Sequence, residues 1–143
     1  MDSEFNIQLS NSKMGLSTLG EFMVLHNPTY AELGLLTFLI EHAENCSLGK
    51  DWPAKLMVAE MEDGGMGSLR LYPEGRYANA RIFGNRISDC RFKDEDGMEV
   101  IASLNLDQNG NLYELDIWKT NFEKLMRIPS DLHELRLVEN KNI

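Results

Sequence analysis

The chain has 143 residues, the usual size of a single domain. With 43% hydrophobic and 26% charged residues, its composition is that of a globular protein, which excludes a disordered tail, a collagen-like fibre and a disulfide scaffold. No apolar run approaches the roughly 18 residues needed to cross a bilayer, and the acidic start of the chain lacks the basic region of a secretory signal. We therefore expect neither a membrane segment nor an exported protein.

Charge and cysteine content narrow the expected partners and compartment. Asp and Glu number 23 against 14 Lys and Arg, a net charge of −9. This excess repels phosphate backbones, so nucleic-acid binding is not expected, whereas a basic protein would be attracted. The two cysteines, Cys46 and Cys90, are expected to be free thiols in a cytoplasmic protein.

A helix is the first element that the sequence predicts. Thr29 and Glu32 have the spacing of a capping box, and Pro28 suits the start of a helix. Apolar residues then recur at spacings of three and four, which gives a broad face to pack against a sheet. Asn45 and Gly49 are expected to end the helix.

Beyond residue 50 the apolar period changes from 3.6 to 2, which predicts strands separated by turns rich in Gly, Asp and Asn. The predicted strands cover 54–62, 68–72, 87–93, 99–106 and 112–120, with 77–83 as a further candidate. A last short helix is expected within 121–126, or within 130–137 with Ser130 as its cap.

These elements define the expected fold class and domain organisation. The order predicts an α+β fold, in which an N-terminal helix packs on an antiparallel β-meander of about five strands, followed by a short C-terminal helix. Residues 1–27 lack an apolar period and are predicted to be a weakly ordered N-terminal arm. One domain is expected over 28–143.

The last hairpin has a register that follows from its turn. Asn109-Gly110 favours a two-residue type I′ turn, which alternates apolar and polar cross-strand pairs. The expected apolar pairs are Leu106 with Tyr113, Leu104 with Leu115 and Ala102 with Ile117, and the expected outward pairs are Asn105 with Glu114, Ser103 with Asp116 and Ile101 with Trp118.

The preceding hairpin admits two registers, and burial decides between them. A two-residue turn would set Arg91 opposite Ala102 and force a guanidinium into the apolar face, at a cost of several kcal/mol. A three-residue loop, Glu95-Asp96-Gly97 with Gly97 left-handed, places Cys90 opposite Ala102 instead. We therefore expect the three-residue loop.

These registers gather polar residues and one tryptophan on the outward face of the sheet. Trp and Arg are enriched at binding hot spots, and tryptophan is normally at least half buried. Either another loop or the N-terminal arm covers Trp118, or Trp118 anchors a recognition surface. The residues predicted to contact a partner are Asp89, Arg91, Asp94, Glu95, Asp96, Glu114, Asp116 and Trp118.

Motifs for metal, phosphate or nucleophilic chemistry do not fit the sequence. Counted from Asp107, position six is Leu112 and position twelve is Trp118, where an EF-hand needs glycine and glutamate. Residues 64–67 lack the lysine and helix of a P-loop, the three histidines lack zinc-site spacing, and neither cysteine has a nucleophile motif. We predict no catalytic residue, cofactor or metal, and no enzymatic activity.

Three segments resemble a known family. They are Met-Glu-Asp-Gly-Gly-Met-Gly-Ser at 61–68, Phe-Lys-Asp-Glu-Asp-Gly at 92–97 and Leu-Tyr-Glu-Leu-Asp-Ile-Trp-Lys at 112–119. They resemble a small bacterial family of uncharacterised function that shares a DGGMGS turn and an ELDxWK strand. The resemblance spans about residues 28–129 and brings no catalytic residues with it. By type, the chain is also similar to immunity proteins of bacterial toxin systems, including contact-dependent growth inhibition.

The expected function is that of an immunity protein, which binds a cognate toxin domain, a basic nuclease, and covers its active site. The alternative is a small-ligand-binding or enzymatic domain that uses Glu114, Asp116 and Trp118, because the two carboxylates share a strand face as an acid–base pair would. The same carboxylates are also explained by a solvent-exposed face on which Arg91 offsets their charge, with no catalytic role. A structural subunit of a larger assembly is the third hypothesis.

Overall fold

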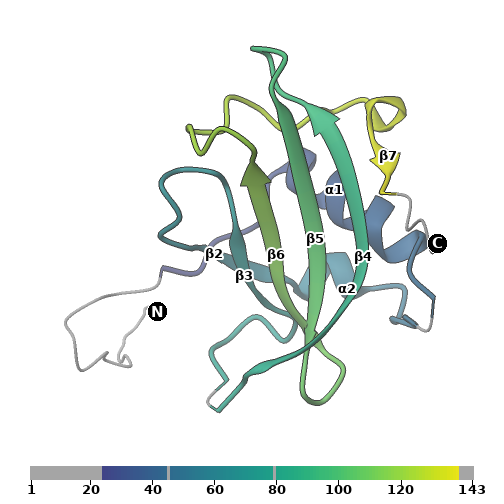
Figure 1. The fold of residues 1–143 in the computed structure, drawn as a ribbon. Helices are drawn as coiled ribbons and strands as arrows, with labels where there is room; N and C mark the ends of the chain where they lie inside the picture. Colours follow the sequence, from purple (N-terminus) through teal and green to yellow (C-terminus); the bar gives the residue numbers. More distant parts are fainter. Residues whose placement is uncertain (1–23, 45, 79, 139–143) are drawn as a thin grey trace.

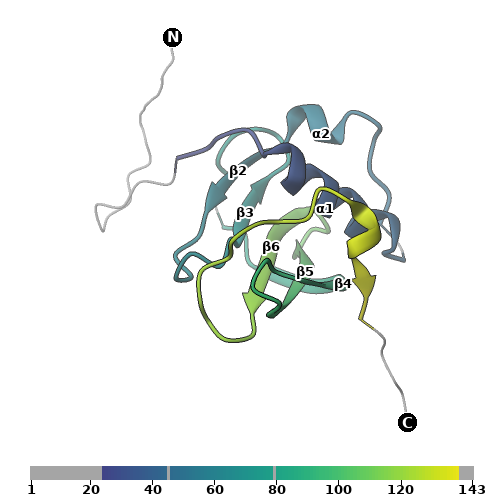
Figure 2. The same cartoon turned by 90° about the horizontal axis from the view of Figure 1, so that it is seen from above.

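The computed structural model describes residues 24–44, 46–78 and 80–138, and it has an α+β fold (Figure 1). A sheet of six antiparallel strands, in the order β2-β3-β6-β5-β4-β7, curves around one long helix (Figure 2). In chain order the elements are α1 (Tyr30–Glu41), α2 (Trp52–Lys55), β2 (Met57–Glu60), β3 (Leu69–Tyr72), β4 (Phe83–Lys93), β5 (Glu99–Asp107), β6 (Leu112–Lys119), the 3₁₀ helix η1 (Leu132–Glu134) and β7 (Arg136–Leu137). The predicted fold class is confirmed, with one strand more than expected.

Helix α1 begins at the predicted capping box. The backbone N–H of Thr29 donates to Glu32 Oε1 at 2.8 Å, and the N–H of Glu32 donates to Thr29 Oγ1 at 3.1 Å. The helix ends at Glu41, earlier than the sequence suggested. The buried leucines of α1 are Leu35, Leu36 and Leu39. They form one core with the inward residues of the sheet, so α1 covers one face of the sheet. None of the helices in the described ranges is long and apolar enough to span a membrane.

The hairpin between β4 and β5 has the predicted three-residue loop. Cys90 pairs with Ala102, and Arg91 pairs with Ile101. Gly97 adopts a φ of 81°, and its N–H donates to the carbonyl of Asp94 at 2.9 Å. The argument from burial therefore identified the register correctly, since the alternative would have placed Arg91 in the core.

The turn between β5 and β6 was predicted wrongly, although most of its register is right. Asn109 keeps a negative φ, so the turn is not type I′, and the loop has three residues. The side chain of Asp107 holds this loop by accepting the N–H groups of Asn109 and Asn111 at 2.8 and 3.0 Å. A bulge then sets Leu106 opposite Leu112 and restores the predicted pairing from Asn105 to Ile101.

Residues 77–83 were a candidate strand but do not form one. Strand β4 instead begins at Phe83 and continues through two bulges. The preceding segment is fixed by Arg81, whose Nε lies 3.0 Å from Asp107 Oδ2 and whose Nη1 donates to the Leu71 carbonyl at 2.8 Å. Arg81 Nη2 also donates to the carbonyl of Leu112. These side-chain contacts replace the strand pairing that the sequence pattern suggested.

The expected boundaries of the first strand and of the last helix also need correction. The predicted strand 54–62 is reduced to β2, because Pro53 lies at the start of the short helix α2. The C-terminal helix is only η1, and its cap is Asp131, which accepts the N–H of His133 at 2.9 Å, and not Ser130. Residues 121–126 form no helix.

The start of the described chain is already part of the sheet. The N–H of His26 donates to the Val58 carbonyl at 2.9 Å, and the N–H of Val58 donates back at 2.8 Å. Of the predicted N-terminal arm over 1–27, only residues 24–27 are described, and among them His26 pairs with Val58. The rest of that prediction, residues 1–23, lies outside the described residues.

Candidate partner-binding face

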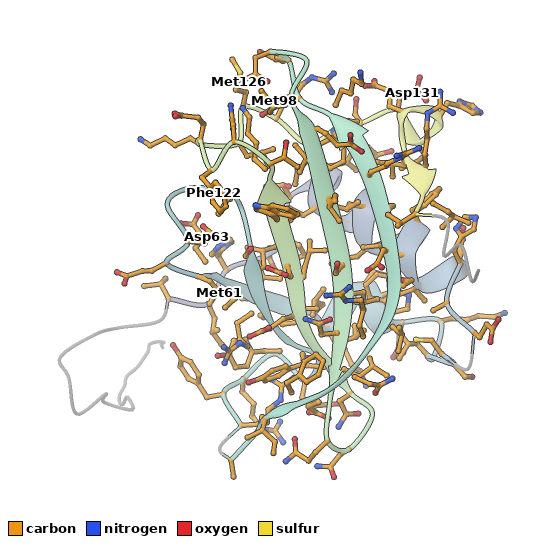
Figure 3. All side chains as sticks on the ribbon, viewed as in Figure 1. Met61, Asp63, Met98, Phe122, Met126 and Asp131 are labelled. Carbon is orange, nitrogen blue, oxygen red and sulfur yellow. The ribbon has the colours of Figure 1, made fainter. Side chains whose placement is uncertain are left out.

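The side of the sheet opposite α1, which we call the outer face, carries most of the residues predicted to contact a partner. Figure 3 shows the side chains of this side in front of the ribbon. The registers place them in three rows across the strands. The rows are Arg70, Glu114, Asn105 and Arg86; Asp116, Ser103 and Asp89; and Trp118, Ile101, Arg91 and Arg136.

An exposed aromatic pair lies at one end of the outer face. Trp118 is 41% exposed, and its ring packs at 6.0 Å and 54° on the ring of Phe122, which is 69% exposed (Figure 3). Phe122 has a φ of 64°, a conformation that costs a bulky residue about 1–2 kcal/mol. The sequence analysis missed Phe122, because the helix considered over 121–126 did not bring it back towards Trp118.

The carboxylates of the outer face differ in how far they are neutralised. Glu114 Oε2 is 2.9 Å from Arg70 Nη2, with both side chains mostly covered. Asp116 is exposed and accepts a long hydrogen bond, 3.4 Å, from Ser68 Oγ. Asp89 lies 3.5 Å from Arg86. Asp116 is thus the carboxylate of this face whose charge is least compensated within the described residues.

Several polar atoms of the outer face are buried without a hydrogen-bond partner. Asn105 is only 7% exposed, and its Oδ1 has no donor. Arg70 Nε is in the same state, and Asp89 Oδ1 accepts no hydrogen bond although it lies 3.5 Å from Arg86 Nε, so three of the four such side-chain atoms in the described residues lie on this face. An unsatisfied buried polar atom costs about 1–3 kcal/mol, so a partner that supplied hydrogen bonds here would gain affinity.

The loop between β4 and β5 contradicts one predicted contact. Asp94 was expected at the exposed rim, but it is 3% exposed and lies 2.9 Å from the Nζ of Lys119, itself 1% exposed. Asp94 also accepts the N–H groups of Met126 and Arg127 at 2.8 and 3.2 Å, which fixes the chain after β6. Asp94 is therefore a structural residue. Of its neighbours, Glu95 is exposed and Asp96 pairs with Lys119 at 2.8 Å while remaining partly exposed.

These contacts shift the pKa values of the groups involved. Burial alone would raise the pKa of Asp94, but hydrogen bonds from Lys119 and from three backbone N–H groups outweigh it and leave the pKa below its usual value. The hydrogen bond from Lys119 also lowers the pKa of Asp96. Burial alone would also raise the pKa of Asp107, but hydrogen bonds from Asn111 and Arg81 outweigh it and lower the pKa. Hydrogen bonds to Asp96 and Asp94 raise the pKa of Lys119.

The direction of these shifts predicts sensitivity to acid. A carboxyl whose pKa is lower in the folded state stabilises the fold above its unfolded pKa, about 3.9, and that contribution disappears as the pH falls through the folded pKa. The free energy of unfolding, measured by urea titration from pH 7 to pH 2.5, should therefore fall below about pH 4. Asp96→Asn should reduce this slope, because it removes one of the three carboxyls. An unchanged slope in that variant would contradict the assignment.

The segments that carry the sequence resemblance meet in the structure. Asp63 accepts the N–H groups of Met66 and Ser68 at 3.0 and 2.9 Å, which closes the glycine-rich turn. Ser68 Oγ then accepts the N–H of Ile117 at 2.8 Å, which joins that turn to β6. Lys119 completes the link to the β4–β5 loop through Asp94. At these positions the segments 61–68, 92–97 and 112–119 therefore serve the fold.

The two cysteines are not placed for nucleophilic chemistry. Cys46 and Cys90 are free, and burial followed by the charge of Asp89 raises the pKa of Cys90 to about 12. A thiol with such a pKa is largely protonated at neutral pH and is a poor nucleophile. Within the described ranges, no three His, Cys, Asp or Glu residues are grouped so as to hold a metal ion.

Comparison with known proteins places the chain in a family. No curated protein and no solved structure matches the chain at a significant level. A family model for a domain of unknown function, DUF6984, matches residues 26–129. The match begins at His26, the residue whose pairing with Val58 starts the described sheet, and runs past β6. Since it covers most of the chain, the protein belongs to the DUF6984 family.

Proposed function

We propose that the protein is an immunity protein, which binds a cognate basic toxin domain through its outer face and blocks the active site of that toxin in the bacterial cytoplasm. The observation that carries this proposal is the exposed Trp118–Phe122 pair beside the incompletely neutralised Asp116. Aromatic residues dominate binding hot spots, and carboxylates complement the basic groove with which a nuclease holds phosphates.

The conformation of Phe122 supports a role in binding. Its N–H donates to the Lys119 carbonyl at 2.8 Å, so the backbone forms a tight turn directly after β6. A glycine or asparagine would adopt this turn with less strain. A large, mostly exposed aromatic ring at a strained position contributes little burial, so its presence is better explained by contact with a partner.

The charge of the chain supports the same partner. A net charge of −9 accelerates the encounter with a basic protein, while the Trp118–Phe122 pair slows dissociation. The acid–base alternative is less well supported, because Glu114 is held by Arg70 in an ion pair and does not face Asp116 as an unpaired group.

The test is a binding titration with the purified product of the neighbouring gene, which the proposal expects to be a basic toxin domain, combined with an assay of toxin activity. Trp118→Ala should weaken binding by about 2 kcal/mol or more, as expected for a hot-spot residue. Asp116→Lys should slow association and weaken its dependence on salt. Phe122→Asn should weaken binding while the melting temperature stays at or above that of the native chain.

Tyr30→Ala is the matched control. Tyr30 is an aromatic residue, 86% exposed, at the start of α1 on the opposite side of the sheet. Its replacement should leave affinity unchanged. The proposal is wrong if the native chain does not bind or inhibit that domain, or if the outer-face variants bind as tightly as the Tyr30 variant.

A further inference from the structure

A groove of about 470 Å³ lies where β4 meets the short edge strand β7, at the edge of the outer face. Its lining residues are Arg91, Phe92, Lys93, Glu99, Glu134 and Arg136. The groove shares Arg91 and Arg136 with the outer face but includes neither Trp118, Phe122 nor Asp116, so a phosphate test can be made without the Trp118–Phe122 pair. Three of the few cations of this acidic chain gather in it.

The strand register brings two of these cations unusually close. Arg91 of β4 and Arg136 of β7 are direct cross-strand partners in an antiparallel pair. The Cβ atoms of such partners are about 4.5–5.5 Å apart, and like charges at these positions destabilise the pairing. Lys93 follows two residues after Arg91 on the same side of β4, about 7 Å along the strand. An anion placed among the three would remove this repulsion.

The acidic residues of the groove do not neutralise it. Glu134 is engaged by Arg127, whose Nη2 lies 3.1 Å from Glu134 Oε1. Glu99 reaches Arg91 only at 3.5 Å. In the part of the chain that the structure describes, neither Lys93 nor Arg136 has an ion-pair partner. Glu99, which is also the cross-strand partner of Lys93, offsets part of the positive charge, and Lys93 and Arg136 are the cations of the groove left without an ion pair among the described residues.

We propose that this groove binds a phosphate group. A guanidinium group pairs with two oxygens of a phosphate at once, and Lys contributes a point charge to a third. A phosphate at neutral pH has a charge near −2 and several acceptor oxygens. Three cations therefore match a phosphate better than they match a carboxylate. The group can come from inorganic phosphate or from a small phosphate monoester.

The experiment measures the melting temperature of the full chain at pH 7.5 as a function of added inorganic phosphate. The buffer itself contains no phosphate, and chloride keeps the ionic strength constant. A ligand that binds only the folded state raises the melting temperature in a saturable way. Arg136→Ala should raise the dissociation constant for phosphate about ten-fold or more, because it removes a charge-assisted hydrogen bond. Glycerol 3-phosphate serves as the second probe, and tighter binding of it identifies a monoester as the source.

Two controls separate a binding site from a structural role. Arg86→Ala removes an exposed arginine earlier on β4, outside the groove, and should leave the phosphate response unchanged. Without phosphate, Arg136→Ala should melt no lower than the native chain, since the substitution relieves like-charge repulsion. A response to phosphate no greater than that to chloride, or an equal response in the Arg136 variant, would overturn the proposal.

Discussion

Replacing Asp94 by alanine should reduce the free energy of unfolding by about 3–5 kcal/mol, because it removes the more deeply buried of the two carboxylates that pair with the buried Lys119. The Nζ of Lys119 lies 2.9 Å from Asp94 and is almost fully enclosed. The same substitution frees the N–H groups of Met126 and Arg127, so the chain after β6 loses its attachment to the β4–β5 loop. Urea denaturation at pH 7 measures the loss.

Asp96→Ala is the matched control for this prediction. Asp96 contacts the same lysine at 2.8 Å but is partly exposed, and its removal leaves Lys119 paired with Asp94. Its effect should be clearly smaller. Adding Lys119→Met to Asp94→Ala should recover much of the loss, because an apolar side chain of similar size removes the buried charge. Equal losses for the two aspartates, or no recovery in the double variant, would contradict the role assigned to Asp94.

The ion pairs of the buried Lys119 were not predicted, although the sequence contains a signal for them. Strand alternation in β6 places Lys119 on the inward side with Leu115 and Ile117. A lysine at an inward position requires an acidic partner, and the aspartates of the β4–β5 loop supply it. The signal was therefore present, but Asp94 was assigned to the residues that contact a partner, because it lies in a segment whose Asp and Gly residues are typical of an exposed turn.

The sequence predicted correctly those elements that are stabilised by contacts within a short segment of the chain. The capping box at Thr29 and the register around Cys90 and Ala102 follow from hydrogen bonds and burial within short segments, and both are confirmed. The segment 77–83 could not be predicted in this way, because Arg81 fixes it through Asp107 and two carbonyls on other strands. Likewise, the Trp118–Phe122 contact depends on how the chain turns after β6.

Gly84→Ala should lower the free energy of unfolding by about 3 kcal/mol, at the upper end of the cost of overpacking. Gly84 lies in the bulge at the start of β4, and a Cβ atom there would overlap the carbonyl group of Asp107. Asp107 is not free to move, because its N–H donates to Asn111 at 2.8 Å and its side chain holds Arg81. The clash must therefore open the pairing of β4 with β5.

The same substitution at Gly34 provides the control with the opposite sign. Gly34 lies inside α1, where alanine is more favourable than glycine by about 0.5–1 kcal/mol. A Cβ there would meet only Leu132 Cδ2 at 3.5 Å, an ordinary contact. Urea denaturation of the two variants should show a lower free energy of unfolding for Gly84→Ala and a slightly higher one for Gly34→Ala. The slope of the unfolding free energy against urea concentration should be the same in both, which confirms a common unfolded state. A Gly84 variant as stable as the native chain would mean that the bulge can move away from Asp107, and that the start of β4 is less firmly fixed than its contacts with Arg81 and Asp107 imply.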